Sequence, residues 1–168
     1  MIPQWALLIS FWLHMLATVA WLGGLAAMAL FVFPSMRRTL TVKEFATWAN
    51  ALNRRLDPAG WFSLGILTFT GLLQMDGNAN YEGLLSISNA WSVAICLKHI
   101  VFLGMIGVSG VLTWSVAPAL SRAALQQARG KASGAAVEHT LRRFQSLIVL
   151  NLLLGLLVLA FTAMARVA

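Results

Sequence analysis

NAWSVAICLKHIVFLGMIGVSGVLTWSVAP, residues 89–118, is an apolar run that contains one Lys-His pair. A helix crosses a bilayer with roughly 20 apolar residues, so this run is long enough to span a membrane. Ionisable groups are costly in hydrocarbon, and each one there is a candidate functional residue. The long side chain of Lys98 can reach the membrane interface. His99 is shorter, and we therefore expect it to have a partner within the protein.

The whole chain has the composition of a membrane protein. Hydrophobic residues make up 60% of its 168 residues, charged residues make up 10%, and the mean hydropathy is +0.80. No segment has the composition of a separate soluble domain, so we predict a single transmembrane domain over residues 1–168. Basic loops on one side of a membrane explain the net charge of +7 without nucleic-acid binding. The single cysteine, Cys96, excludes an internal disulfide and a CxxC metal site.

Four predicted spans account for the apolar sequence, at about residues 5–33, 59–75, 90–117 and 144–165. The first is expected to end at Pro34, and it is too long for the core of a signal peptide. The predicted fold class is all-α, an integral-membrane, up-down four-helix bundle.

A short interfacial amphipathic helix is predicted in the first cytoplasmic loop, residues 41–56. Thr41 and Glu44 have the spacing of a capping box at its start. Apolar residues then recur at helical spacing, and the basic residues lie off that stripe. We expect this helix to lie in the headgroup layer of the membrane. Its apolar stripe consists of Val42, Phe45, Ala49, Leu52 and Leu56.

The distribution of basic residues predicts the orientation. The first and third loops each hold five Lys or Arg residues, whereas the second loop holds none. Basic loops stay in the cytoplasm, so both termini and the acidic second loop should face outward.

Two histidines are predicted at similar depth in the outer half of the membrane. His14 lies about ten residues into the first span and His99 about ten into the third, on the order of 15 Å from the outer ends. The first and third helices of such a bundle face each other across its interior, where two imidazoles can hold a metal ion or a haem iron. We take His14 and His99 as axial ligands of haem b, with Lys98 and Arg166 meeting the propionates.

Alternative roles stay open for these and other polar residues. Each of the two histidines could instead bond a carbonyl or a hydroxyl and serve only the bundle. Imidazole also ligates copper, and Cys96 or Met15 could complete a copper site. His139 lies beside Glu138 in a basic loop and is interpreted as solvated. Asn151 is interpreted as a contact between helices.

Two blocks of sequence carry a resemblance to a known family. Residues 14–38, HMLATVAWLGGLAAMALFVFPSMRR, resemble the membrane domain of copper resistance protein D. Residues 81–99, YEGLLSISNAWSVAICLKH, resemble the segment that enters the third helix of that CopD-like family. The resemblance implies a four-helix domain of the bacterial inner (cytoplasmic) membrane that is connected with copper uptake or tolerance. It carries over the histidine at His14 and the one at His99.

A more distant resemblance is to the four-helix membrane protoporphyrinogen oxidase HemJ. It rests on His14 followed by residues 21–24, WLGG, and on Lys98 as the counterpart of a lysine in a later helix. This resemblance implies haem b binding.

The predicted function is electron transfer or redox relay, to or from a quinone or a redox partner protein. Copper binding or transport is the alternative. It ranks second because a transporter needs a polar path, and the inner half of the bundle offers only Asn151 and a few hydroxyls. A purely structural subunit is the third possibility. The sequence has no constellation of a hydrolase or transferase, whereas a redox activity stays open. Expected partners are membrane lipid and either a second copy or a larger complex, but no nucleic acid.

Overall fold

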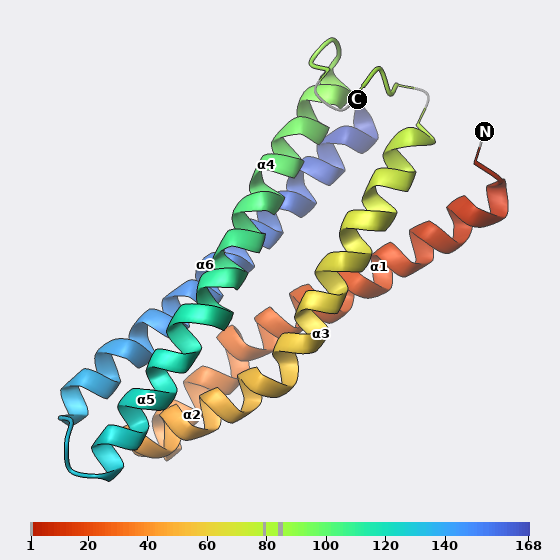
Figure 1. The fold of residues 1–168 in the computed structure, drawn as a ribbon. Helices are drawn as coiled ribbons and strands as arrows, with labels where there is room; N and C mark the ends of the chain where they lie inside the picture. Colours follow the sequence, from red (N-terminus) through yellow and green to blue (C-terminus); the bar gives the residue numbers. More distant parts are fainter. Residues whose placement is uncertain (1, 79, 84–85) are drawn as a thin grey trace.

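The computed structural model describes residues 2–78, 80–83 and 86–168, and this part of the chain is helical with no strand (Figure 1). The all-α prediction is therefore confirmed. Three helices are long and apolar enough to cross a membrane, namely Gln4–Thr39, Ala90–Ala128 and Gly134–Val167, as expected of a membrane protein. The helical elements, in chain order, are α1 (Gln4–Ala26), η1 (Ala27–Val32), α2 (Phe33–Thr39), α3 (Val42–Asp76), α4 (Ala90–Val111), η2 (Leu112–Val116), α5 (Ala117–Ala128) and α6 (Gly134–Val167).

The prolines do not end the first and third long helices, which continue beyond the predicted span ends at residues 33 and 117. Helix continues to Thr39 in one case and to Ala128 in the other. A turn of π-helix, η1 or η2, lies just before Pro34 and Pro118. A proline lacks an N–H and crowds the carbonyl four residues earlier, and a wider turn relieves both defects. The helix therefore continues past the proline.

The predicted interfacial helix is also wrong as a separate element. Its capping box is confirmed, because the Thr41 hydroxyl accepts from the Glu44 N–H and the Glu44 carboxylate accepts from the Thr41 N–H. The helix that starts there continues through Pro58 to Asp76. Phe45 and Ala49 on its apolar stripe are buried. The core of the bundle thus takes up the middle of the stripe, whereas Val42 and Leu56 at its two ends are exposed.

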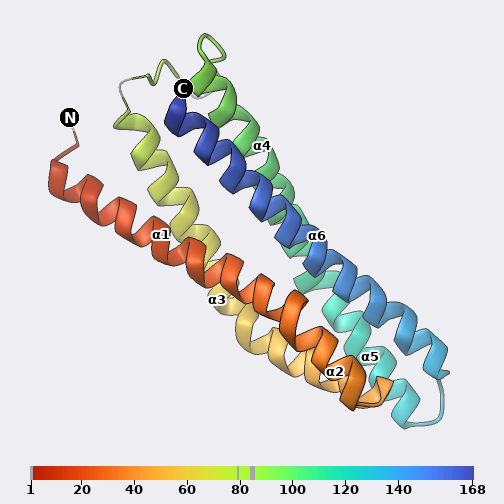
Figure 2. The same cartoon turned by 180° about the vertical axis from the view of Figure 1, so that it is seen from behind.

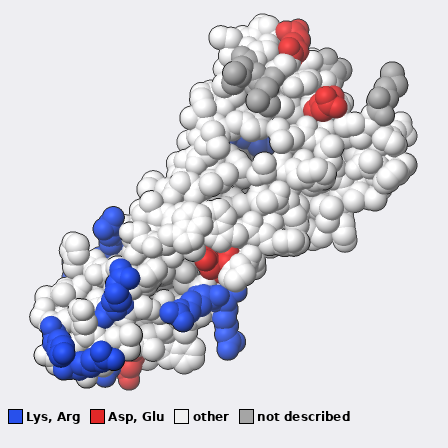
Figure 3. Space-filling model, viewed as in Figure 1, with Lys and Arg blue, Asp and Glu red and all other residues white. Residues whose placement is uncertain are grey.

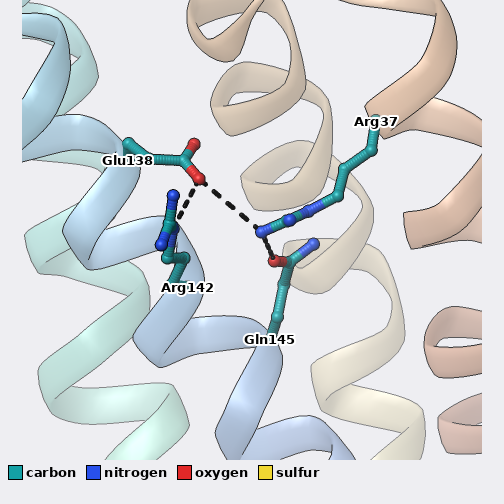
Figure 4. A network of polar contacts seen from close by, with 4 residues as sticks. All are labelled: Arg37, Glu138, Arg142 and Gln145. Atoms are coloured by element: carbon teal, nitrogen blue, oxygen red, sulfur yellow. Dashed lines mark hydrogen bonds and ion pairs between the residues drawn. The ribbon is translucent and has the colours of Figure 1, made fainter.

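The main hydrophobic core lies at the end of the bundle that carries the basic turns. Phe33 lies between Phe45 and Phe144, with ring-centroid distances of 5.9 and 6.1 Å. Figure 4 shows a polar network at this end, where Arg37 of α2 donates to Gln145 of α6 at 2.6 Å. Glu138 accepts from Arg142 at 2.7 Å and lies 3.7 Å from Arg37. Both apolar and polar contacts thus tie α2 and α3 to α6.

At the opposite end, where both termini lie, the helices separate into two pairs. Helix α1 runs beside α3, and α4 runs beside α6, and the pairs diverge towards the termini in both views (Figures 1 and 2). In the face shown in Figure 3, blue Lys and Arg side chains gather at the end away from the termini. The described structure therefore has a tightly packed basic end and a more open terminal end.

The two pairs are also an internal repeat, which the sequence interpretation missed. We call α1, η1, α2 and α3 the first half, and α4, η2, α5 and α6 the second half. His14 and His99 each lie thirteen residues before the first residue of a π-helical turn. Thr70 and Thr162 occupy the same position counted from the starts of α3 and α6. Each half is thus a helix with a π turn and a proline, followed by a long antiparallel helix.

Candidate histidine site

The four residues predicted to bind haem lie on three helices. His14 is on α1, Lys98 and His99 are on α4, and Arg166 is in the last turn of α6. The side chains of His14, Lys98 and His99 are partly buried, and Arg166 is exposed. The sequence predicted the positions of these groups along the helices, but not their partners.

His14 is fixed by a hydrogen bond to another helix. Its Nδ1 lies 2.7 Å from the Thr70 hydroxyl oxygen on α3, and that hydroxyl donates to the Ile66 carbonyl at 2.6 Å. Because the single hydroxyl proton is used on the carbonyl, His14 Nδ1 must carry a proton and donate it to Thr70. The neutral imidazole then has its free electron pair on Nε2, the atom available to a metal ion.

Two further polar side chains support this contact between α1 and α3. The Ser10 hydroxyl donates to the Thr70 carbonyl at 3.2 Å, and the Gln74 amide donates to the Ser10 carbonyl at 3.2 Å. Sequence reasoning did not identify Thr70 as the partner of His14. Polar residues spaced four apart on two consecutive spans, Ser10 with His14 and Thr70 with Gln74, were the available signal.

His99 is fixed within its own helix. Its Nδ1 lies 2.7 Å from the Ile95 carbonyl, which can only accept a hydrogen bond. Nδ1 of His99 therefore carries the proton, and Nε2 again has the free electron pair. The donor chemistry of both histidines thus fits an axial ligand of haem or a copper ligand.

Lys98 lies next to His99 on α4, and its side chain is partly buried. Among the described residues Lys98 forms no ion pair, since the two that the structure shows join Glu138 to Arg37 and Arg142. A cation without a paired carboxylate is suited to meet an anionic group of a ligand.

The remaining candidates lie apart from any larger ligand cluster. No group of three or more His, Cys, Asp or Glu side chains in the described residues could hold a metal ion. Cys96 is a partly buried free thiol, and Met15 is 60% exposed. His139 is exposed, as interpreted from the sequence. Asn151 of α6 donates to the Ser109 hydroxyl of α4 at 2.9 Å, which confirms its predicted role between helices.

No family model, curated protein or solved structure matches this chain. The resemblance to copper resistance protein D and to the oxidase HemJ therefore stays a prediction.

Proposed function

We propose that this protein is a small b-type haem protein of the bacterial inner membrane, with His14 and His99 as axial ligands. The observation that carries the proposal is the state of the two imidazoles. Each has its Nδ1 proton held by a protein oxygen, and each has its Nε2 electron pair free. Bonds of this kind at the second nitrogen orient metal-binding histidines and raise their basicity.

In the proposed topology, α3 crosses the membrane in addition to the three long apolar helices, which gives four spans and places both termini outside. This topology is supported by the gathering of Lys and Arg at the end away from the termini (Figure 3). His14 and His99 then belong to the outer half of the membrane, on helices of different pairs. A ligand that both histidines bind would join the two halves where the pairs diverge.

Bound haem would supply a one-electron couple, and the chain would tune and orient it. His14 and His99 would hold the iron, and Lys98 and Arg166 would meet the propionates. Electrons would pass to or from a quinone or a partner protein, and membrane lipid would surround the bundle. A second copy of the chain or a larger complex could supply that partner.

An absorption spectrum of the purified protein, oxidised and then reduced, tests this proposal. We expect a low-spin haem spectrum that is lost in His14→Ala and in His99→Ala. His139→Ala is the matched control, because this exposed histidine lies near the start of α6, at the other end of the bundle. A colourless preparation from haem-replete cells would contradict the proposal.

Copper binding or transport, as the family resemblance implies, is the second candidate. The observation in its favour is Cys96, a partly buried thiol three residues before His99 on α4 and so close to its face. Elemental analysis should then find copper that is lost in the His14→Ala, His99→Ala double mutant. If the double mutant keeps its fold and the activity of its complex, the histidines are purely structural.

A further inference from the structure

A second polar region lies in the middle of the bundle, towards the basic end. It surrounds a cavity of about 100 Å³ that is lined by residues of α1, η1, α3, α4, η2 and α6. Asn53, Asp57, Ser109 and Asn151 supply most of its polar lining, beside Trp21 and Trp61. None of the proposed haem ligands contributes to it.

Asp57 is the charged residue of this cavity, and the sequence interpretation had placed it in a cytoplasmic loop. It lies instead within α3 and is partly buried. Its Oδ1 accepts from the Thr113 hydroxyl at 2.6 Å, and that hydroxyl accepts from the Trp61 indole N–H at 3.1 Å. Thr113 lies in the π turn η2, and such turns are frequent at functional sites.

The carboxylate of Asp57 forms no ion pair with any residue that the structure describes. The ion pairs seen among the described residues involve only Arg37, Arg142 and Glu138. Arg54 and Arg55 are near in sequence but exposed. A partly buried carboxylate without a cation is unfavourable unless another positive charge or water approaches it.

Asn151 adds an unpaired hydrogen-bond acceptor to the same cavity. It is only 1% exposed, and its amide group donates to the Ser109 hydroxyl at 2.9 Å. Its carbonyl oxygen, Oδ1, has no hydrogen-bond partner. Nearly all buried polar groups in proteins have a partner, so this oxygen calls for a ligand in the cavity.

We propose that this cavity binds a monovalent alkali cation, with sodium as the ion that fits best. The carboxylate of Asp57, the amide oxygen of Asn151 and the hydroxyl of Ser109 are hard oxygen ligands. One carboxylate that forms no ion pair among the described residues balances one positive charge, whereas calcium sites commonly combine several carboxylates. The volume, about that of three waters at ~30 Å³ each, holds an ion with one or two waters.

Thermal unfolding in detergent at constant ionic strength tests the proposal in sodium, potassium and choline chloride. An alkali ion at about 100 times its Kd should raise the Tm by about 5–10 °C relative to choline, an ion that is too large for the site. Asp57→Asn should remove this response. Asp76→Asn is the matched control, because Asp76 is exposed at the C-terminal end of the same helix. This substitution should leave the response unchanged.

Retention of radioactive sodium by the wild-type protein gives a second measurement that does not depend on a variant folding. We expect retained sodium to be displaced by excess unlabelled sodium and not by choline. Equal Tm values in all three salts, or no retained sodium, would mean that the cavity holds only water and would overturn the proposal. The haem spectrum should not depend on the salt, so this site and the histidine site can fail independently.

Discussion

The two halves of the molecule place a histidine at the same position but fasten it differently. In the first half, His14 donates across the helix pair to Thr70. In the second half, His99 donates to Ile95 of its own helix. Thr162, the counterpart of Thr70, donates to the Val158 carbonyl and does not bond His99. The orientation of His14 therefore depends on the packing of two helices, whereas that of His99 depends on one helix alone.

The residues around the two histidines explain this difference. Ser10 lies four residues before His14, whereas an isoleucine lies four residues before His99. Gln74 lies four residues after Thr70, whereas Arg166 lies four residues after Thr162. The first half thus has neutral polar groups that join α1 to α3. The second half has an isoleucine and an arginine in those places. Among the described residues, no polar side chain there joins α4 to α6 beside His99, so the arginine is available to a ligand.

The largest expected effect concerns the basic end, where the halves should behave alike. Phe45 and Val137 occupy the same position in α3 and α6, and they are 2% and 0% exposed. Phe45→Asp and Val137→Asp each bury an unpaired charge, which should lower the free energy of unfolding by about 3–5 kcal/mol. Denaturation and extraction yield measure this loss.

In those variants the haem or metal content per folded molecule should be unchanged, because the histidines lie far from this end. A Phe45→Asp protein that folds normally but has lost its cofactor would contradict the proposed placement of the site.

The next effect distinguishes the two threonines. Thr70→Val removes the acceptor of the His14 Nδ1 proton, and it should lower the free energy of unfolding by about 1–2 kcal/mol. It should also broaden or weaken the low-spin haem spectrum, because the ring loses its fixed orientation. Thr162→Val should change stability by less than about 0.5 kcal/mol. Equal effects on both measurements would show that the cross-helix bond does not orient His14.

A smaller effect is expected from the cation of α4. Lys98→Gln removes a positive charge near the proposed iron. The loss of this charge stabilises the oxidised state of the iron, which is the more positive one. The midpoint potential should fall by on the order of tens of millivolts, the size expected of the Coulomb interaction between two partly buried charges. Redox titration measures the change, and Arg122→Gln, an exposed residue of α5, is the control. An unchanged potential together with unchanged haem content would remove Lys98 from the site.

The smallest effect concerns the helix caps and is visible only as a pH dependence. Hydrogen bonds from the Thr41 side chain and backbone hold the pKa of Glu44 below its ordinary value of 4.5. Its contribution to stability is therefore complete above pH 4.5 and is lost as the pH falls through the lower pKa of the folded state. Ser133 caps α6 alone, with Ala136 where α3 has Glu44.

Thermal unfolding at pH 7 and at low pH measures this difference. The loss of stability in Glu44→Gln should shrink as the pH falls, whereas the loss in Ser133→Ala should stay the same. A pH-independent effect of Glu44→Gln would mean that the carboxylate does not support the cap.

Local chemistry along the chain was sufficient to predict much of this protein. Hydropathy is a sum over neighbouring residues, so the long apolar helices and the membrane class follow from composition alone. The capping box of Thr41 and Glu44 depends on residues three apart, and the positions of His14 and His99 along their helices depend only on the sequence. The exposure of His139 and the helix contact of Asn151 also follow from their residue types and surroundings.

Only the tertiary structure decided which segments meet. The partner of His14 is 56 residues away, because α3 packs on α1 and brings Thr70 to the imidazole. Phe45 packs against Phe33 and is buried in the protein. Its hydropathy alone would equally allow it to lie in a membrane surface. The π turns let two helices continue past prolines, and the long α3 brought Asp57 to a partly open cavity between the helices. These outcomes depend on side chains from distant segments filling one another's spaces, which no local periodicity encodes.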